Sequence, residues 1–418
     1  MLKLASNHQS ENNEFTLSLD EIAREGAKRL LVEALDLEVA EYIQKFRMER
    51  DENGRALVVR NGKSKTRRVT TGAGTIEVQT PRVNDKRVDQ KFSSNILPPY
   101  LRRSANVESL LPLLYLKGLS GNAFSDALVQ ILGEGASGLS ASSISALKKS
   151  WKAEFEQWKF QQIKDRIAYV WADGVNVKIR LGEDKKQCLL VIIGVTEHGD
   201  KKLLAVEPGY RESEESWSLV LRDLKRRGLE APLLAIGDGA LGFWKALSNV
   251  YPTTREARCW VHKVANVLDK LPKRLQGKAK ERLHAIMYAE DKSDAQAGLA
   301  AFKEDFERKY EKAVKCLEKD FDKLIVHFNF PASHWAHIRT TNPIESVFAT
   351  VKLRTRVTKG AGNADIASTM AFKLLLEAEK KWRKIRSPEE VRNILNGLEY
   401  RDGILIVNSD QKVKAANA

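Results

Sequence analysis

The chain has few cysteines and no long apolar run. Its three cysteines, Cys188, Cys259 and Cys316, are an odd and widely spaced set that forms no disulfide framework. No apolar stretch approaches the roughly 20 residues of a membrane-spanning helix. Residues 1–15 lack a basic region followed by an apolar stretch, so we expect no signal peptide. These absences predict a cytoplasmic protein that does not contact a membrane.

Several catalytic motifs are also missing. The sequence contains no Walker-type loop, no G-x-S-x-G motif and no dinucleotide fingerprint followed by a suitable acid, which disfavours a nucleotide-hydrolysing motor and an acyl hydrolase. Basic residues outnumber acidic ones. The chain has 70 Lys and Arg and 55 Asp and Glu, which gives a net charge of +15. This excess favours a polyanionic partner, most often DNA or RNA, although solubility alone could explain it.

The N-terminal region combines a polar tail with helical and β patterns. Residues 1–15 are predicted to be a disordered tail, because they contain few apolar side chains. Ser18 or Asp20 is placed to cap a first helix, and a second helix is expected at 39–47. We expect residues 16–105 to form a DNA-binding domain of helices and a basic hairpin.

The hairpin is predicted by two short β patterns. Val69–Thr71 and Thr75–Gln79 flank the turn-forming residues Gly72-Ala73-Gly74. A run of cations leads into this hairpin, where a nucleic-acid backbone could be bound. The residues that we assign to DNA binding here are Arg60, Lys63, Lys65, Arg67 and Arg68.

Residues 106–160 return to a helical pattern. Three short helices are expected, separated by turns that contain glycine, and the last begins near Ser142. This order is typical of a helix-turn-helix domain, whose final helix enters the major groove, so Ser142, Lys148 and Lys149 would contact DNA. A plain α-helical hairpin produces the same pattern and remains the alternative.

From residue 161 to 260 the pattern changes to α/β. Strands are expected at 167–172, 175–180, 188–196, 202–207, 232–236 and 256–259. Helices at 214–227 and 241–249 alternate with the last strands. This order matches the first part of a ribonuclease-H-like catalytic core. An all-helical insertion at 261–335 would interrupt that core, residues 336–400 would complete it with closing helices, and 401–418 would form a C-terminal tail.

Three acidic residues lie at the ends of predicted elements. Asp173 follows the apolar run 167–172, Asp238 follows 233–237, and Glu345 opens a helix. In a ribonuclease-H-like sheet the first and fourth strands are parallel neighbours, so both aspartates would share one edge. A two-metal phosphoryl-transfer site needs such carboxylates.

Each of these residues also has an ordinary structural explanation. Asp173-Gly174 is a strong hairpin-turn dipeptide, and Asp238 could cap the following helix. Glu345 falls at the third helical position if Asn342 is the N-cap, as in a capping box. Their joint placement in a basic chain favours catalysis.

The helix after Glu345 is basic. Lys352 and Arg356 recur on the face of Glu345, beside the acidic site. We assign Lys352, Arg354, Arg356 and Lys359 to DNA contact, although a solvated basic face is the usual explanation of such a run.

Cys259 and His262 form a C-x2-H pair, and His334 and His337 form an H-x2-H pair. A zinc site built from these four residues is one alternative. Packing of Cys259, with His262 facing the acidic site or a phosphate, is the interpretation that we favour, because no second half-site lies at zinc-finger spacing.

Several motifs together resemble the Mutator-type insertion-sequence transposases of bacteria. The motifs are Ala172-Asp173-Gly174, Gly237-Asp238-Gly239-Ala240, Arg258-Cys259-Trp260-Val261-His262 and Thr340-Thr341-Asn342-Pro343-Ile344-Glu345-Ser346. The resemblance covers most of the chain. It implies a DDE transposase with a helical insertion, in which Asp173, Asp238 and Glu345 bind metal and Cys259 and His262 are the family's C-x2-H signature.

The resemblance also implies cofactors and partners. These are Mg²⁺, with two ions expected and Mn²⁺ able to replace them, double-stranded DNA as terminal inverted repeats and target, and a homodimer or larger assembly on DNA. A bacterial, nucleoid-associated location would follow. Two other functions stay open: a catalytically silent DNA-binding regulator derived from a transposase, and a ribonuclease-H-like structure-selective nuclease.

Overall fold

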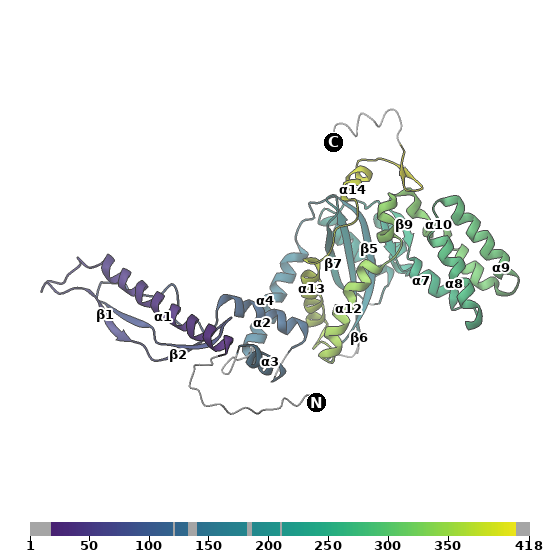
Figure 1. The fold of residues 1–418 in the computed structure, drawn as a ribbon. Coiled ribbons are helices and arrows are strands. Elements are labelled where there is room, and N and C mark those ends of the chain that lie inside the picture. The colour runs from purple at the N-terminus through teal and green to yellow at the C-terminus, as the bar shows by residue number, and fades with distance from the viewer. Residues whose placement is uncertain (1–17, 120–121, 133–139, 182–185, 210, 407–418) are drawn as a thin grey trace, which may run out of the picture. The chain divides into compact units, whose positions relative to one another are not determined.

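The computed structural model divides the chain into two compact units, Met1–Ser145 and Ala146–Ala418 (Figure 1). The division falls within α4 (Ala141–Lys159). The predicted disordered tail at 1–15 lies outside the described residues, and the domain boundaries drawn from the sequence remain predictions. The residues that the structure describes are 18–119, 122–132, 140–181, 186–209 and 211–406.

One long helix, α1 (Leu19–Lys45), begins the described part of the first unit. Ser18 caps it, because its hydroxyl accepts the Glu21 N–H at 3.3 Å and the Glu21 carboxylate accepts the Ser18 N–H at 2.7 Å. The prediction of two separate helices is wrong here. Residues 32–38 contain helix-forming Leu, Ala and Glu and no breaker, so the helix continues through them.

Two antiparallel strand pairs pack against α1. β2 (Arg67–Thr71) and β3 (Gly74–Val78) form the predicted hairpin. β1 (Val58–Lys63) pairs with β4 (Pro81–Asp85), which the sequence pattern does not reveal because five of the six β1 residues are exposed. Apolar side chains from the helix and the hairpin form a small core that includes Leu35, Val69, Ile76, Val78 and Leu97.

Three helices follow, as predicted. They are α2 (Ala105–Lys117), α3 (Asn122–Leu132) and α4. α2 ends at Gly118, whose φ of 115° lies in the left-handed region that glycine adopts without strain. Residues 120–121 and 133–139, which include parts of the predicted turns, lie outside the described residues, so the helix-turn-helix domain remains a prediction.

A five-stranded sheet forms the centre of the second unit, in the order β7-β6-β5-β8-β9. β5, β6 and β7 are antiparallel neighbours, whereas β8 runs parallel to β5 and β9 parallel to β8. The first and fourth strands are therefore parallel neighbours, as predicted. The strand bounds are β5 (Ile167–Lys178), β6 (Lys186–Thr196), β7 (Lys201–Gly209), β8 (Leu234–Gly237) and β9 (Arg255–Arg258).

β5 is one continuous strand where the sequence predicted two. Asp173 and Gly174, expected to form a turn, instead pair with Val191 and Leu190 of β6. An Asp-Gly dipeptide turns the chain where its flanking strands pair with each other, and here both flanks pair with β6. The parallel ladder with β8 nevertheless ends at Ala172, one residue before Asp173.

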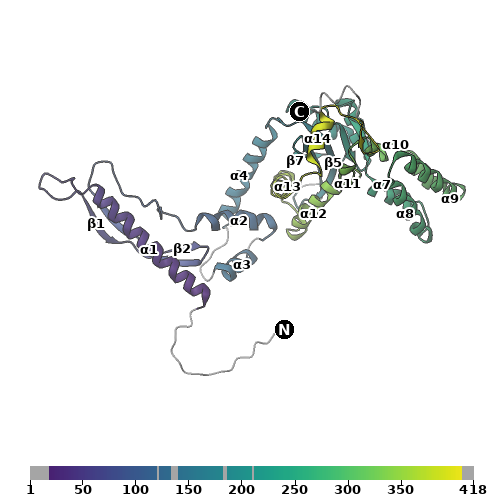
Figure 2. The same ribbon diagram turned by 45° about the horizontal axis from the view of Figure 1, so that its top comes forward.

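Helices cover both faces of this sheet (Figures 1 and 2). α5 (Glu214–Arg226) and α6 (Leu241–Val250) pack on the face that carries Val170 and Ala172. On the other face, Tyr169 Oη lies 2.7 Å from His334 Nδ1, and Trp171 Nε1 donates to the His337 carbonyl oxygen at 3.2 Å. Side chains alternate along a strand, so Asp173 points to the same face as Trp171.

The second face is covered by α12 (Asn342–Val357) and α13 (Ala364–Glu379). Both ends of α12 are tied to other elements. Before its first residue, the Thr341 N–H donates to Cys259 Sγ at 3.3 Å. After its last residue, the Ala361 N–H donates to the Lys178 carbonyl oxygen and the Arg180 N–H donates to the Ala361 carbonyl oxygen, each at 2.8 Å.

The segment between β9 and α12 is helical, as predicted. Its elements are α7 (Trp260–Leu268), α8 (Lys273–Met287), α9 (Lys292–Glu318), α10 (Phe321–Leu324), η1 (Val326–Asn329), η2 (Ala332–His334) and α11 (Trp335–Ile338). Figure 1 shows α8 and α9 side by side, away from the sheet. No helix in the described ranges is long and apolar enough to cross a membrane.

The chain closes with α14 (Pro388–Leu395) and a short antiparallel pair, β10 (Tyr400–Arg401) and β11 (Ile404–Leu405). The sequence predicted one or two closing helices over 364–396, and the structure has two, α13 and α14. The residues predicted as a C-terminal tail therefore begin inside a small hairpin, and 407–418 lie outside the described residues.

Candidate active site

Asp173 and Asp238 occupy equivalent positions at one edge of the sheet. Each immediately follows the last pair of the parallel ladder, Ala172 and Gly237. Backbone amides orient both carboxylates: the Gly174 N–H donates to Asp173 Oδ1 at 2.7 Å and the Ala240 N–H donates to Asp238 Oδ1 at 2.9 Å. Asp238 therefore supports a turn, but it is not the N-cap of α6, a position that Ala240 holds.

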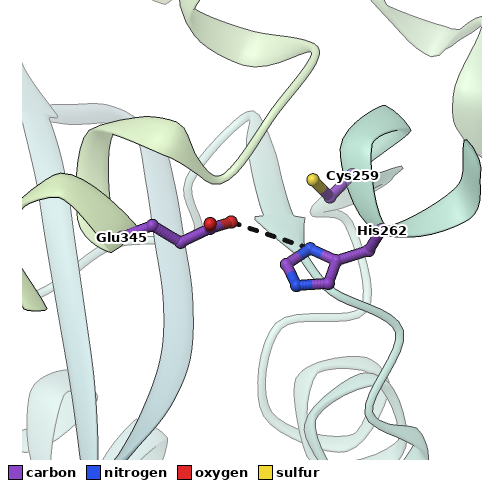
Figure 3. A group of neighbouring side chains, drawn as sticks. All are labelled: Cys259, His262 and Glu345. Atoms are coloured by element: carbon purple, nitrogen blue, oxygen red, sulfur yellow. Dashed lines mark ion pairs between the residues drawn. The ribbon is translucent and has the colours of Figure 1, made fainter. Parts of the chain in front are cut away.

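Glu345 reaches the site from the first turn of α12. Its N-cap is Thr341 rather than Asn342, so Glu345 is the fourth helical residue and the expected capping box does not form. The Thr341 hydroxyl donates to Glu345 Oε1, which lies 3.7 Å from His262 Nδ1 (Figure 3). Glu345 therefore accepts a hydrogen bond from the Thr341 side chain instead of forming the predicted capping box. This bond holds the Glu345 carboxylate near His262 of α7.

Asp238 and Glu345 both lie close enough to Asp173 for their charges to act on its carboxylate. Burial, together with the charges of Asp238 and Glu345, raises the pKa of Asp173 to about 6. The Gly174 N–H and His262 act in the opposite direction. Several carboxylates that repel one another offer the hard oxygen ligands that a divalent cation such as Mg²⁺ takes. The chemistry of these donors suits Mg²⁺, whose binding here remains a prediction.

Cys259 and His262 form the other side of the cluster. Cys259 is buried at the N-cap of α7, and its Sγ lies 3.2 Å from the Thr341 hydroxyl oxygen. His262 extends from α7 toward Glu345, and its Nδ1 is 3.4 Å from the same hydroxyl (Figure 3). Thr341 therefore connects Cys259, His262 and Glu345.

The charges of this group reinforce one another. The hydrogen bond to Cys259, together with the charges of Glu345 and Asp238, raises the pKa of His262 to about 9. These effects outweigh burial, which acts in the opposite direction. Burial raises the pKa of the Cys259 thiol, but hydrogen bonds from His262 and Thr341 outweigh that effect and lower it. At neutral pH His262 is thus a cation that faces the acidic cluster, as the favoured interpretation predicted.

The alternative zinc site of Cys259, His262, His334 and His337 is wrong. His334 bonds to Tyr169 and to the Ser387 carbonyl oxygen, and His337 Nε2 accepts the Arg386 N–H at 3.4 Å. In the described part of the chain, the potential ligand atoms that gather within 4.8 Å of one another are those of Cys259, His262 and Glu345.

Three residues of the site were not assigned from the sequence. Thr341 and Arg258 lie inside quoted motifs, but no role followed from their spacing. The Arg258 guanidinium packs against Gly239, where a side chain would overlap it, and its Nε lies 3.6 Å from Asp320 Oδ2. Glu212, in the loop before α5, is close enough to Asp238 and Asp173 for their charges to raise its pKa.

In the first unit, the predicted DNA-binding cations differ in their surroundings. Lys63 and Lys65 are exposed. Arg60 is paired with Asp36, and Arg68 donates to Glu77 Oε1 at 2.8 Å across the hairpin. The half-buried Arg67 donates to the Pro98 carbonyl oxygen at 3.0 Å. Arg67 therefore supports the local fold.

The cations of α4 and α12 also divide into two groups. Lys149, Lys352 and Arg356 are exposed, as are Ser142 of α4 and Lys359 just after α12, whereas Lys148 is half-buried. Arg354 is only 7% exposed. It therefore does not share the solvent-facing surface of Lys352 and Arg356 on which the predicted DNA contact depends.

Comparison with known proteins identifies the family. A family model described as "Transposase, Mutator family" matches residues 2–385. The chain belongs to the Mutator family of transposases. The resemblance inferred from the Asp173, Asp238, Cys259–His262 and Glu345 motifs is confirmed, because the match spans all of them.

Named relatives of this Mutator-family chain are transposases of insertion elements. The transposase for IS6120 of Mycolicibacterium smegmatis is 49% identical over 301 residues, which cover 72% of this chain and 93% of the relative. The transposase for IST2 of Acidithiobacillus ferrooxidans is 46% identical over 294 residues, covering 69% and 99%. The transposase for IS256 in Tn4001 of Staphylococcus aureus is 25% identical over 369 residues, covering 87% and 91%.

Proposed function

We propose that this chain binds the terminal inverted repeats of its own insertion element and catalyses metal-dependent DNA strand cleavage and strand transfer. Asp173, Asp238 and Glu345 are the catalytic carboxylates. The observation that carries the proposal is that Asp173 and Asp238 follow paired residues of two parallel strands, while Glu345 joins their charge cluster from α12.

The proposal includes a ribonuclease-H-like core of the DDE type. Its support is the strand order β7-β6-β5-β8-β9, with three antiparallel strands followed by two parallel ones. A helical insertion then separates β9 from the Glu345 helix. This order brings the first and fourth strands together, which the proposed site requires.

The carboxylates would hold two Mg²⁺ ions, or Mn²⁺ in their place. When bound, such ions supply activation of the attacking oxygen and stabilisation of the leaving oxygen in an in-line displacement. Asp173 and Asp238 would be oriented for this by the Gly174 and Ala240 amides, and Glu345 by Thr341. The His262 imidazolium would lie beside the phosphate's negative charge.

Two displacements would complete the reaction. Water attacks a phosphodiester at the element end, a P–O bond forms as the bond to the 3′ oxygen breaks, and the 3′ oxygen takes up a proton. The freed 3′-hydroxyl then attacks a phosphodiester of the target: its oxygen loses its proton and forms a new P–O bond, while the bond to the target's own 3′ oxygen breaks and that oxygen leaves as a 3′-hydroxyl by taking up a proton. Neither step needs an oxidant or a protein nucleophile.

DNA would approach along α12, where Lys352 and Arg356 are exposed. The hairpin cations and the helices of the first unit would read the inverted repeats. A homodimer or larger assembly would hold two ends together, in the bacterial cytoplasm at the nucleoid.

The test uses the full chain and its gene's own flanking DNA. Wild-type protein and a Glu345→Gln variant are incubated with this DNA and Mg²⁺, and new 3′ ends and joined products are mapped by sequencing. We expect metal-dependent cuts at a repeated sequence and strand joining, both lost in the variant.

Other outcomes would favour the two other functions. Specific binding without cutting by either protein would support the DNA-binding regulator. Cutting that depends on DNA shape, with no joined products, would support the structure-selective nuclease. Equal activity of the Glu345→Gln variant would refute the assignment of Glu345.

A further inference from the structure

Glu212 lies in the loop between β7 and α5, and its side chain contacts the backbone beside Asp173. A Cβ on Gly174 would overlap the Glu212 carboxylate and would come within 2.9 Å of its Cγ. Gly174 directly follows Asp173 on β5. The lack of a side chain at Gly174 therefore leaves the space in which the Glu212 carboxylate lies.

A second glycine fixes the backbone of Glu212. A Cβ on Gly242 of α6 would overlap the Glu212 carbonyl oxygen and would lie 2.7 Å from the Glu214 backbone nitrogen. The next residue, Ser213, caps α5 by accepting the Ser216 N–H at 3.2 Å. The loop is thus packed against α6 on one side and begins a capped helix on the other, so Glu212 has a defined place.

Glu212 and Glu345 approach the sheet edge from opposite faces. Gly174 alternates with Asp173, so it faces the α5 and α6 side, where Glu212 lies. Burial, together with the charges of Asp238 and Asp173, raises the pKa of Glu212 to about 7, against an opposing effect of His262. In the described ranges, no hydrogen bond or ion pair joins the Glu212 carboxylate to another side chain. His262 partly offsets the neighbouring negative charges, but in the described ranges it forms no ion pair with Glu212.

We propose that Glu212 is a fourth carboxylate of the metal-binding edge. The inference rests on the proposed function, because it needs a divalent cation beside Asp173 and Asp238. Two divalent cations carry four positive charges, which Asp173, Asp238, Glu345 and Glu212 together balance. Hard carboxylate oxygens at this edge are also the ligands that Mg²⁺ and Mn²⁺ prefer. Glu212 binds a cation directly or through a bound water.

The test compares Mn²⁺ binding by the full-length wild-type protein and three variants. Glu212→Gln removes the charge and keeps the shape. Gly174→Ala keeps the carboxylate but fills the space that it occupies. Glu215→Gln is the matched control, because Glu215 is an exposed glutamate three residues further along. Mn²⁺ affinity is measured by isothermal titration calorimetry without DNA, and the Mn²⁺-induced increase in Tm is measured in parallel.

We expect Glu212→Gln and Gly174→Ala to weaken Mn²⁺ binding by about tenfold or more, while Glu215→Gln matches the wild type. In EDTA, Glu212→Gln should melt no lower than the wild type, because removing a negative charge relieves repulsion. A purely structural role would instead lower the EDTA Tm and leave Mn²⁺ affinity unchanged, which would overturn the inference.

A fourth protein, Asp238→Asn, separates the two proposals. If Asp238→Asn loses Mn²⁺ binding while Glu212→Gln retains it, the Glu212 inference is wrong and the proposed metal site stands. If the wild type binds no Mn²⁺, both are wrong.

Discussion

The sheet edge of the second unit and the strand pairs of the first unit hold their charged residues in different ways. At the edge, Asp173 and Asp238 are positioned by a parallel ladder and by backbone amides. In the first unit, the cations on and beside β1 and β2 are mostly exposed, and Arg60 and Arg68 pair with nearby acids. Backbone groups therefore place the acids, whereas most of the cations are exposed or are held by ion pairs on the surface.

The largest expected effect comes from the sheet edge. Asp238→Asn should lower DNA cleavage and joining by at least about 1000-fold, since loss of one metal-binding carboxylate removes several kcal/mol of transition-state stabilisation. DNA binding should change by less than about threefold. Cleavage is measured on element-end DNA with Mg²⁺, and binding by fluorescence anisotropy in EDTA. Retained cleavage would show that Asp238 supports a turn alone.

A pair of glycines gives the next largest effect. Gly239→Ala should destabilise the second unit by about 1–3 kcal/mol, because Gly239 has a φ of 97° and a Cβ there would overlap the Arg258 guanidinium. Gly26→Ala should instead stabilise α1 by about 0.5–1 kcal/mol, because no atom lies within 4 Å of a Cβ at this helical position.

Urea unfolding can separate the two glycine effects. All eight tryptophans lie at or after Trp151, so tryptophan fluorescence reports on the second unit, while far-UV circular dichroism reports on both. Gly239→Ala should shift the fluorescence transition, and Gly26→Ala should leave it in place. The reverse pattern would contradict our account of which region is tightly packed.

The buried carboxyl of Asp173 should make the stability of the protein depend on pH. The pKa of Asp173 is raised from 3.8 to about 6, so between these values the folded state holds a proton that the unfolded state has released. The free energy of unfolding therefore falls as pH rises through this window. In EDTA, Asp173→Asn should gain about 1–2 kcal/mol over the wild type between pH 4 and pH 7. Parallel pH profiles of the two proteins in urea titrations would count against this.

The smallest effect is expected from exposed cations. Lys352→Ala or Arg356→Ala should weaken DNA binding uniformly across sequences and reduce the slope of log affinity against log salt concentration by about 0.9 per lost phosphate contact. Lys315→Ala is the control, because it removes the same charge from an ion pair with Glu311 on α9. Equal slopes for all variants would show that α12 does not contact the backbone of DNA.

Much of the second unit was predictable because its signals are local. Asp238 follows an apolar run, and Asn342-Pro343 indicates the start of the helix that carries Glu345. The turn predicted at Asp173-Gly174 failed because strand partners, not the dipeptide, determine whether the chain turns. Arg354 was predicted on the correct helix, but it was expected to contact DNA and is instead buried. Its burial depends on which face of α12 packs against the sheet, and the sequence does not reveal that face.

Glu212 was missed for a related reason. It precedes Ser213-Glu214-Glu215, and in sequence it cannot be distinguished from the acids that commonly begin a helix. What distinguishes it is the close approach of Gly174 and Gly242, which come from β5 and α6. Such an approach between distant segments has no local signature.

The two ends of α12 have a mechanical consequence. Thr341 bonds to Cys259 before the helix begins, and Ala361 bonds to Lys178 after it ends, so a tilt of the helix would break hydrogen bonds at one end. The amide hydrogens of Ala361 and Arg180 should accordingly exchange with solvent as slowly as those inside the sheet. Hydrogen bonds at both ends therefore keep α12 in a fixed position. Glu345 is thus held in place by the fold itself, and under the proposed function we expect bound DNA, rather than this helix, to move.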